Sequence, residues 1–166
     1  MKRFALFKTP LGWSAIVTGD AGIERIALPR RSKRKLLREI LVQFPDAVHN
    51  PIALRGEARQ IKEYLVGKIR ALDLPLNLKR LSPFQRQVYL LTHTIPYGQM
   101  RSYAWVARTL GRPKAARAVG RALARNPFPL AIPCHRVVRS DGDLGGFSGG
   151  RWLKGTLLKL ERGAIR

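Results

Sequence analysis

The residues best suited to chemistry surround the only cysteine of the chain, Cys134. His135 follows it directly, and Arg136 and Arg139 lie close by, with no carboxylate before Asp141. A neighbouring imidazole and nearby cations favour the charged form of a thiol and lower its pKa. The segment therefore predicts a reactive thiolate. The alternative is a buried Cys134 that acts as a small hydrophobic residue, which is the usual role of a free cysteine.

The position of His135 directly after the cysteine raises a geometric difficulty. In an extended strand, consecutive side chains point to opposite faces. For His135 to take a proton from Cys134, the chain must bend after Pro133, or a water must bridge the two groups.

A single cysteine excludes an intramolecular disulfide and a zinc site with several thiolates. A mixed set of Cys134, His135, His93 and His49 is formally possible, but its spacing matches no metal motif. We therefore expect no metal and no cofactor.

The charge of the chain is strongly positive. Its 166 residues include 32 Lys and Arg against 10 Asp and Glu, a net charge of +22. Between Asp73 and Asp141 there is no carboxylate, whereas twelve basic residues lie from Lys79 to Arg139. A surface that serves only solubility interleaves the two signs. The pattern indicates a polyanionic partner, of which nucleic acid is the commonest. The alternative is an arginine-rich surface that is merely solvated.

Two short helices are expected in this acid-free stretch, at residues 102–110 and 114–125. Ser102 is a helix N-cap residue and Gly111 a stop signal, and a Gly-containing turn between two helices is typical of a helix-turn-helix. The second helix carries basic residues that step by three, four and four and share one stripe: Lys114, Arg117, Arg121 and Arg125. Ala118 in the same stripe adds little bulk, which favours close approach to a groove of DNA. The alternative is a solvated basic face.

The remaining periodicity predicts an α+β fold: an N-terminal antiparallel β-sheet with helices, then a mostly helical C-terminal domain containing the helix-turn-helix. Alternating runs at 4–7, 13–17 and 23–28 predict a meander, and 3.6-residue spacing predicts helices at 32–44 and 52–66. Residues 72–78 alternate and predict an edge strand or an extended linker. Ser82, Pro83 and Gln85 predict the capped start of a helix that reaches His93. The domains expected are 1–80 and 81–166.

Residues 132–137, with the sequence IPCHRV, resemble the active-site motif of the O6-alkylguanine-DNA alkyltransferases, also called methylated-DNA–protein-cysteine methyltransferases. The resemblance extends over residues 82–163. It also includes PYGQMRSY at 96–103, RAVG at 117–120, NP at 126–127, GGFSGG at 145–150 and LLKLE at 157–161. Residues 1–80 fit the family only in length and general character. The resemblance implies a scaffold role for 1–80 and a DNA-binding, alkyl-accepting role for 81–166.

The resemblance implies catalytic roles for the matching positions. Cys134 would accept the alkyl group, and His135 would act as a base through a water while Glu161 orients its ring. Tyr103 would assist rotation of the nucleotide and donate to the flipped guanine. Asn126 would tie the helix-turn-helix to the active-site segment. From the residues alone, Glu161 could instead be a surface residue and Tyr103 a core residue.

The resemblance also implies which residues contact DNA. Arg117 would enter the duplex from the minor groove where the lesion leaves the stack. Further DNA contacts are expected from Ser102, Tyr103, Lys114, Ala118 and Arg121. The pocket for the flipped base is expected to include Pro129, Gly145, Phe147 and Ser148. Phe147 stands where many members of the family have tyrosine, so a hydroxyl is missing from guanine recognition at this position.

The function implied is repair of DNA by irreversible, single-turnover transfer of an alkyl group from O6 of guanine to Cys134. The expected partner is double-stranded DNA containing O6-alkylguanine, and the expected state is a monomer. No apolar run is long enough to span a membrane, so we expect a cytoplasmic protein, nucleoid-associated in a prokaryote. One alternative is a non-catalytic damage-binding module that flips alkylated bases. Another is a thiol hydrolase that uses Cys134 and His135.

Overall fold

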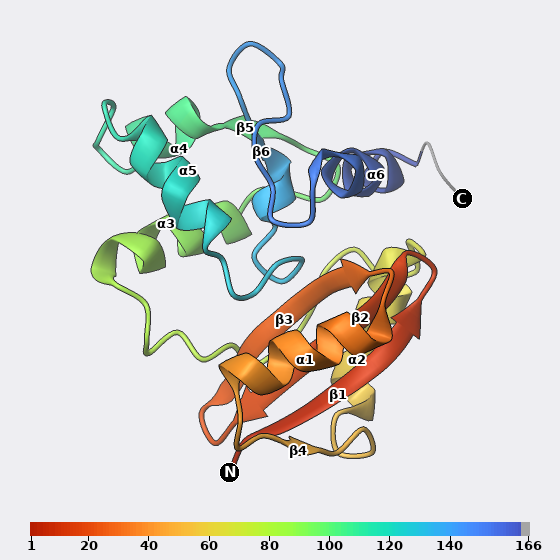
Figure 1. The fold of residues 1–166 in the computed structure, drawn as a ribbon. Helices are drawn as coiled ribbons and strands as arrows, with labels where there is room; N and C mark the ends of the chain where they lie inside the picture. Colours follow the sequence, from red (N-terminus) through yellow and green to blue (C-terminus); the bar gives the residue numbers. More distant parts are fainter. Residues whose placement is uncertain (164–166) are drawn as a thin grey trace. The chain divides into compact units, whose positions relative to one another are not determined.

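The computed structural model describes residues 1–163, and the chain divides into two compact units, Met1–Asn77 and Leu78–Arg166. The division falls close to the boundary that the sequence places near residue 80. The first unit is a sheet with two helices and the second is mostly helical, so the fold is α+β (Figure 1).

Three strands of the first unit form the antiparallel meander that the sequence predicts: β1 (Arg3–Thr9), β2 (Gly12–Gly19) and β3 (Gly22–Arg30). Short turns join them, and the second turn ends at Gly22, which has φ 115°. A residue that has a side chain rarely adopts this backbone conformation. A Cβ at Gly22 would also lie 2.3 Å from the carbonyl oxygen of Pro75, so glycine permits residues 72–78 to approach β3.

The sheet is mixed rather than wholly antiparallel, because it has a fourth strand that the sequence did not predict. β4 (Val48–His49) pairs in parallel with the beginning of β1, which gives the strand order β3-β2-β1-β4. A strand of two residues is too short to show a period of two in the sequence. Residues 72–78 form an extended linker, which is one of the two predicted possibilities. Their backbone pairs with β3 through an isolated bridge between Ile23 and Leu76 rather than as a strand.

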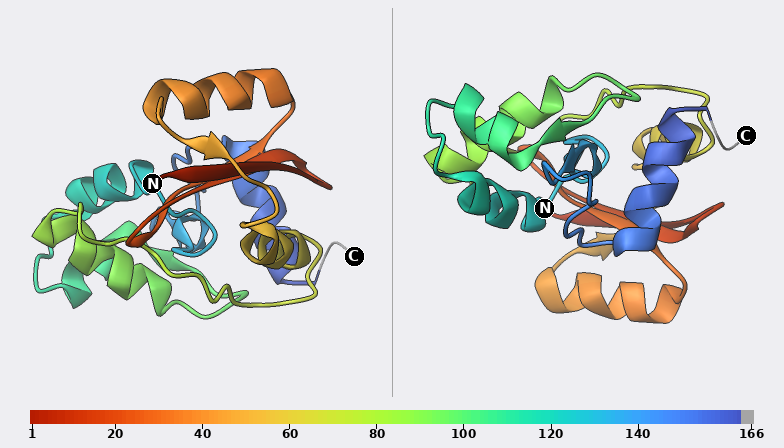
Figure 2. Two further views of the ribbon diagram at one scale, coloured as in Figure 1. Left: turned by 90° about the horizontal axis from the view of Figure 1, so that it is seen from below. Right: turned by 90° about the horizontal axis from the view of Figure 1, so that it is seen from above.

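Two helices cover opposite faces of this sheet, α1 (Lys33–Gln43) and α2 (Arg55–Leu65) (Figure 2). The Ser32 side chain caps α1 by accepting a hydrogen bond from the backbone N–H of Lys35. The hydrophobic core beneath α1 consists of Phe4, Ala15, Val17, Ala27, Leu36, Ile40 and Phe44. On the other face, α2 buries Ala58, Ile61, Tyr64 and Leu65.

The second unit begins with α3 (Pro83–His93), whose start is the one predicted. The Ser82 hydroxyl accepts from the N–H of Gln85, and the Gln85 side chain accepts from the N–H of Ser82, so both residues of the capping box are used. Tyr89 of this helix is buried and donates its hydroxyl to the carbonyl of Ala122 at 2.8 Å. This bond ties α3 to a later helix of the same unit.

The two helices of the acid-free stretch are α4 (Tyr103–Thr109) and α5 (Ala116–Ala124), which pack against each other (Figure 1). Ser102 caps α4 by accepting from the N–H of Trp105, as its position predicts. However, α5 begins two residues later than expected. Residues 112–115 form a turn, closed by a 2.9 Å bond from the N–H of Ala115 to the carbonyl of Arg112, in place of a first helical turn.

The second unit contains four further elements that the periodicity of the sequence did not resolve. These are the short parallel strands β5 (Arg101–Ser102) and β6 (Val137–Val138), the 3-10 helix η1 (Cys134–Arg136) and the helix α6 (Arg151–Glu161). The motif residues at 132–137 thus lie at the junction of η1 and β6, and the residues at 157–161 form the end of α6.

Within residues 1–163, no helix is both long enough and apolar enough to cross a lipid bilayer. In the same part of the chain, no three His, Cys, Asp or Glu side chains gather into a set that could hold a metal ion.

Candidate active site

The chain bends directly before Cys134, which is the first residue of η1. Pro133 has φ −78° and ψ 64°, and its carbonyl accepts from the N–H of Arg136 at 2.9 Å. A bend at Pro133 is one of the two possibilities that the sequence left open, the other being a water that bridges Cys134 and His135, because a continuing strand would place their side chains on opposite faces. Both side chains are buried, with Cys134 4% exposed and His135 0% exposed.

The loop before the cysteine is fixed by the buried side chain of Asn126, which follows α5. Its Nδ2 donates to the carbonyl of Ile132 and its Oδ1 accepts from the N–H of Phe128, both at 2.9 Å. Between these points Leu130 has φ 74°, a conformation that costs a non-glycine residue about 1 kcal/mol or more. The two bonds of Asn126 offset this strain and hold the segment that presents Cys134.

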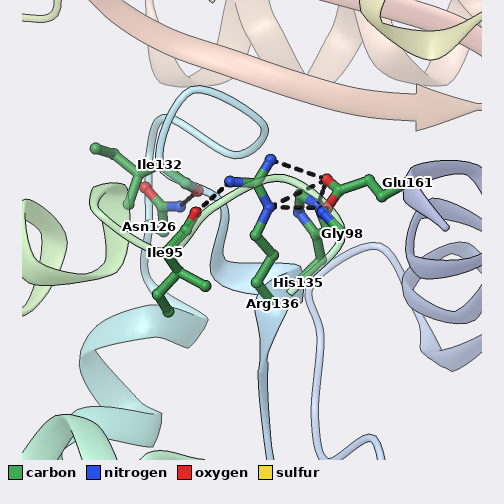
Figure 3. Close-up of polar contacts among 7 residues, drawn as sticks. All are labelled: Ile95, Gly98, Asn126, Ile132, His135, Arg136 and Glu161. Atoms are coloured by element: carbon green, nitrogen blue, oxygen red, sulfur yellow. Dashed lines mark hydrogen bonds and ion pairs between the residues drawn. The ribbon is translucent and has the colours of Figure 1, made fainter. Parts of the chain in front are cut away.

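The carboxylate of Glu161, at the end of α6, lies at the centre of a buried hydrogen-bond network (Figure 3). It contacts Nε2 of His135 at 2.5 Å, and it accepts from Nε of Arg136 and from the N–H of Gly98, each at 2.9 Å. Arg136 also donates to the carbonyl of Ile95 at 2.6 Å. Because Nε2 of His135 is turned to the carboxylate, Nδ1 is the ring nitrogen that would act on Cys134.

Burial controls the ionisation of both residues of the pair. It raises the pKa of the Cys134 thiol, whereas hydrogen bonding with Asn126 and the positive charge of Lys154 lower that pKa less strongly. Burial also lowers the pKa of His135, against the opposite effect of Glu161. The sequence-based prediction of a lowered thiol pKa is therefore wrong for this structure. A protonated thiol and a neutral imidazole are the two forms from which a proton transfer from sulfur to nitrogen starts.

Arg136 does not act on Cys134 as the sequence suggested. Its guanidinium is committed to Glu161 and Ile95, and it lies over the Tyr97 ring at 5.6 Å from the centroid. The cation that lowers the pKa of Cys134 is instead Lys154.

Lys154 of α6 is fully buried, which is rare for a lysine. Its ammonium donates to the carbonyls of Val137 at 2.6 Å and Gly146 at 3.3 Å, and to that of Leu144. It also donates to the hydroxyl of Tyr103 at 3.3 Å. Burial lowers the pKa of Lys154 to about 8. The carbonyls thus enclose a cation that holds the loop before α6 in place.

Tyr103 lies between this cation and the loop. Its hydroxyl donates to the carbonyl of Gly146 at 3.4 Å, and burial, with a smaller effect of Cys134, raises its pKa. Gly145 has φ 71°, and a Cβ there would lie 3.0 Å from the Tyr103 hydroxyl. Glycine therefore allows the loop to pass directly over this hydroxyl.

A cavity of about 950 Å³ opens in front of Cys134 within the second unit. Of the residues predicted to contact the base, four line it: Tyr103, Gly145, Phe147 and Ser148. Pro129 does not belong to this lining; it is buried and forms a bridge with Ile132. Cys134 is therefore covered by packing on most sides but faces an open cavity on one.

The basic residues of α5 meet this cavity only in part. Arg117 and Arg121 are exposed and line it. Ala118 is half-buried and does not line it, and Lys114 lies in the turn before α5 rather than on the predicted helical stripe. Ser102 uses its hydroxyl to cap α4. The cavity is thus lined by Cys134, by two arginines of α5 and by Arg139.

Sequence reasoning missed Lys154 as a site residue, although a signal was present. Lys154 stands on the apolar stripe of α6, with Leu157, Leu158 and Glu161 at spacings of three, four and seven. A lysine on the buried face of an amphipathic helix must find partners in the interior. That requirement alone would have marked the position.

The site defines a protein that offers one buried thiol to a group entering a cavity with a basic wall. Residues 83–163 match the sequence profile of the family described as "6-O-methylguanine DNA methyltransferase, DNA binding domain". A methylated-DNA–protein-cysteine methyltransferase of Methanosarcina acetivorans is 34% identical over 95% of this chain and 97% of its own length. The constitutive enzyme of that name in Bacillus subtilis is 36% identical over 98% of this chain and 96% of its own length. The chain belongs to the methylated-DNA–protein-cysteine methyltransferase family.

Solved structures agree with this assignment. The crystal structure of Mycobacterium tuberculosis OGT in complex with DNA superposes with a TM-score of 0.83 at 32% identity, covering 98% of this chain and 94% of that one. The O6-methylguanine-DNA methyltransferase of Pyrococcus kodakaraensis gives a TM-score of 0.70 at 26% identity, covering 97% of this chain and 99% of that one.

Proposed function

We propose that this protein repairs DNA by moving an alkyl group from O6 of guanine to the sulfur of Cys134, irreversibly and once per molecule. The observation that carries the proposal is the position of Cys134, buried beside the His135–Glu161 pair and open to a cavity walled by α5. The names of the relatives supply the substrate class, methylated DNA.

The His135 side of the site removes the thiol proton. Burial keeps Cys134 protonated and His135 neutral at rest, so the imidazole can take the proton, through a water, as the sulfur attacks. Glu161, held by Arg136 and Gly98, stabilises the imidazolium that forms.

The Tyr103 side of the site serves the leaving group. As the S–C bond forms, the C–O6 bond breaks and its electron pair goes to the guanine, which becomes an anion. A donor aimed at developing negative charge lowers the barrier. Tyr103, with the Lys154 ammonium behind it at 3.3 Å, donates to this anion and delivers the proton that completes the guanine. Ser148 of the loop lines the same cavity, and its backbone N–H provides a further donor, whereas the N–H of Gly145 is bonded to Oδ1 of Asp143 at 2.8 Å.

The α5 side of the site admits the base. An O6 substituent inside a duplex is out of reach of a side chain, so the nucleotide must leave the stack at a cost of a few kcal/mol. Arg117 is exposed at the cavity wall and enters the duplex in the place of the extruded base, while Arg121 and Lys114 contact the phosphates. We treat α4 and α5 as the helix-turn-helix that brings this wall to DNA.

The transfer reaction has a direct test. Incubation with duplex DNA containing O6-methylguanine should replace one hydrogen by one methyl group on the peptide that contains Cys134, read by mass spectrometry. The thioether is stable, and the chain has no second cysteine to accept the group, so product should stop at one equivalent of protein. An unmodified peptide after excess substrate would reject the proposal. Continued product formation would favour a hydrolase.

We also propose that the protein acts as a monomer in the cytoplasm, associated with the nucleoid in a prokaryotic cell, because its substrate is DNA. Light scattering during gel filtration tests the first point, and fractionation of the source cells tests the second.

A further inference from the structure

A second basic surface lies in the first unit, and none of its residues belongs to the site described above. A hollow of about 490 Å³ is lined by residues of β1, β2, α1 and α2. Five of its lining residues are cationic, and they come from three separate segments: Lys8, Lys33, Arg55, Arg59 and Lys62. No carboxylate belongs to the lining. We call these five residues the β1-edge cluster.

The hollow follows an open strand edge. β4 pairs only with Arg3 and Phe4, so within residues 1–163 no strand lies beside the rest of β1 on that side. The floor contains Leu6, Phe7 and Trp13. A strand edge that ends in a concave surface between two helices is accessible to a ligand.

Aromatic rings and one exposed ion pair position the cations around the hollow and leave most of their charge uncompensated. The ammonium of Lys33 lies over the Trp13 ring at 4.7 Å, and that of Lys62 lies over the Phe7 ring at 5.8 Å. Arg59 lies 3.8 Å from Glu63 in an exposed pair of the kind that contributes little. Five like charges around one hollow repel one another, and a bound polyanion would relieve that repulsion.

We propose that the β1-edge cluster binds the phosphate backbone of double-stranded DNA, as a contact surface separate from α5. Duplex DNA carries one charge per ~1.7 Å of axis, so several cations within one hollow can meet neighbouring phosphates. The choice of DNA over another polyanion rests on the proposed function, which brings the protein to DNA. The surface contributes affinity without sequence preference, because phosphate contacts carry none.

The salt dependence of binding measures this surface quantitatively. Arg55, Arg59 and Lys62 are all exposed on α2, so a triple substitution to glutamine should leave the fold intact. If each contacts one phosphate, the slope of log K against log salt should become shallower by roughly 2.7, that is, about 0.9 for each contact. The matched control replaces Arg34, Lys35 and Arg38, which are exposed on α1 and do not line the hollow. That control should change the slope by less than about one.

The experiment uses the full chain and an undamaged duplex, so its result is independent of alkyl transfer. Methyl transfer to Cys134 from free O6-methylguanine base should stay the same in both triple variants. Equal changes of slope in the two variants would show a general field and overturn the proposal. An unchanged slope would also overturn it and would leave the cations as protection of a strand edge against pairing. Binding of polyglutamate with an unchanged DNA slope would assign the hollow to an acidic protein instead.

A second measurement detects contact directly. Reductive methylation with ¹³C labels lysines and keeps their charge. On titration with duplex, the signals of Lys8, Lys33 and Lys62 should shift, whereas those of Lys35 and Lys68, outside the lining, should shift much less. Shifts of equal size at all five lysines would contradict a localised surface.

Discussion

Two buried charges on α6, Glu161 and Lys154, have opposite surroundings. Glu161 is enclosed by donors: the His135 ring, the Arg136 guanidinium and the N–H of Gly98. Lys154 is enclosed by acceptors, which are three backbone carbonyls and a tyrosine hydroxyl. Seven residues separate the two, which places them on one face of the helix about 10 Å apart along its axis. One helix thus supplies an anion and a cation to the same site.

The difference between the two surroundings matches the two proton transfers that alkyl transfer requires. At Glu161, a carboxylate backs a neutral imidazole, which suits removal of a proton from the thiol. At Lys154, an ammonium with a pKa of about 8 backs a tyrosine, which suits delivery of a proton to the departing guanine. One helix can therefore support both a base, His135, and an acid, Tyr103, because different groups enclose the two charges that it supplies.

The largest effect on methyl transfer is expected when the negative charge of Glu161 is removed. Glu161→Gln keeps the shape of the side chain but leaves Arg136 buried without its counter-charge and His135 without a partner for its positive form. We expect the methyl-transfer rate to fall by roughly 10²- to 10⁴-fold, the usual size of a base contribution. The free energy of unfolding should fall by about 3–5 kcal/mol, as for a broken buried ion pair. Single-turnover kinetics and urea unfolding measure the two.

The choice of substrate separates this defect from one in DNA binding. Because Glu161 is proposed to act on Cys134 through His135, its substitution should slow transfer from free O6-benzylguanine and from duplex DNA by similar factors. Arg117→Ala should slow transfer from duplex DNA far more than from the free base, since Arg117 is proposed to act on the duplex. If Glu161→Gln affected only the duplex reaction, the division of roles between α5 and α6 would be wrong.

A smaller effect on methyl transfer is expected when the positive charge of Lys154 is removed. Lys154→Met should slow methyl transfer by roughly 10- to 100-fold, less than loss of a direct donor to the leaving group, because Lys154 is proposed to act through Tyr103. Lys159→Met, on the exposed side of the same helix, is the matched control and should leave the rate unchanged. Equal rates for wild type and Lys154→Met would show that Tyr103 needs no cation behind it.

The pH dependence of stability gives Lys154 a distinct signature. Its pKa is about 8 in the folded state and about 10.5 in the unfolded state. Between these values the unfolded state binds more protons, so this group makes the free energy of unfolding rise with pH. Wild type should therefore gain stability relative to Lys154→Met as the pH increases from 8 toward 10. Parallel curves for the two proteins, from urea unfolding at each pH, would contradict the assigned pKa.

The surroundings of Glu161 and those of Lys154 also differ in how well the sequence predicts them. The sequence pointed to His135 and Glu161 because they lie in contiguous motifs that resemble a family, and Pro133 indicated the bend before Cys134. Lys154 lies in no such motif, and its partners stand 8 to 51 residues before it in the chain. The purpose of Arg136 was misjudged for the same reason, since adjacency to Cys134 in sequence does not reveal a partner 25 residues away. Local signals predicted elements and caps, whereas enclosure of a charge depends on tertiary contacts.

The smallest effect is expected at Gly98, whose backbone N–H donates to the carboxylate of Glu161. Gly98 has φ 78°, and a Cβ there would lie 3.1 Å from the carbonyl oxygen of Glu161. Gly111 has a similar φ of 70° but nothing within 4 Å of its Cβ position. Alanine at either position should cost about 1–2 kcal/mol of stability from the left-handed conformation. Only Gly98→Ala should also displace the N–H that holds Glu161, and so slow methyl transfer several-fold. If Gly111→Ala slowed transfer as much, general destabilisation, rather than the position of the carboxylate, would explain the loss.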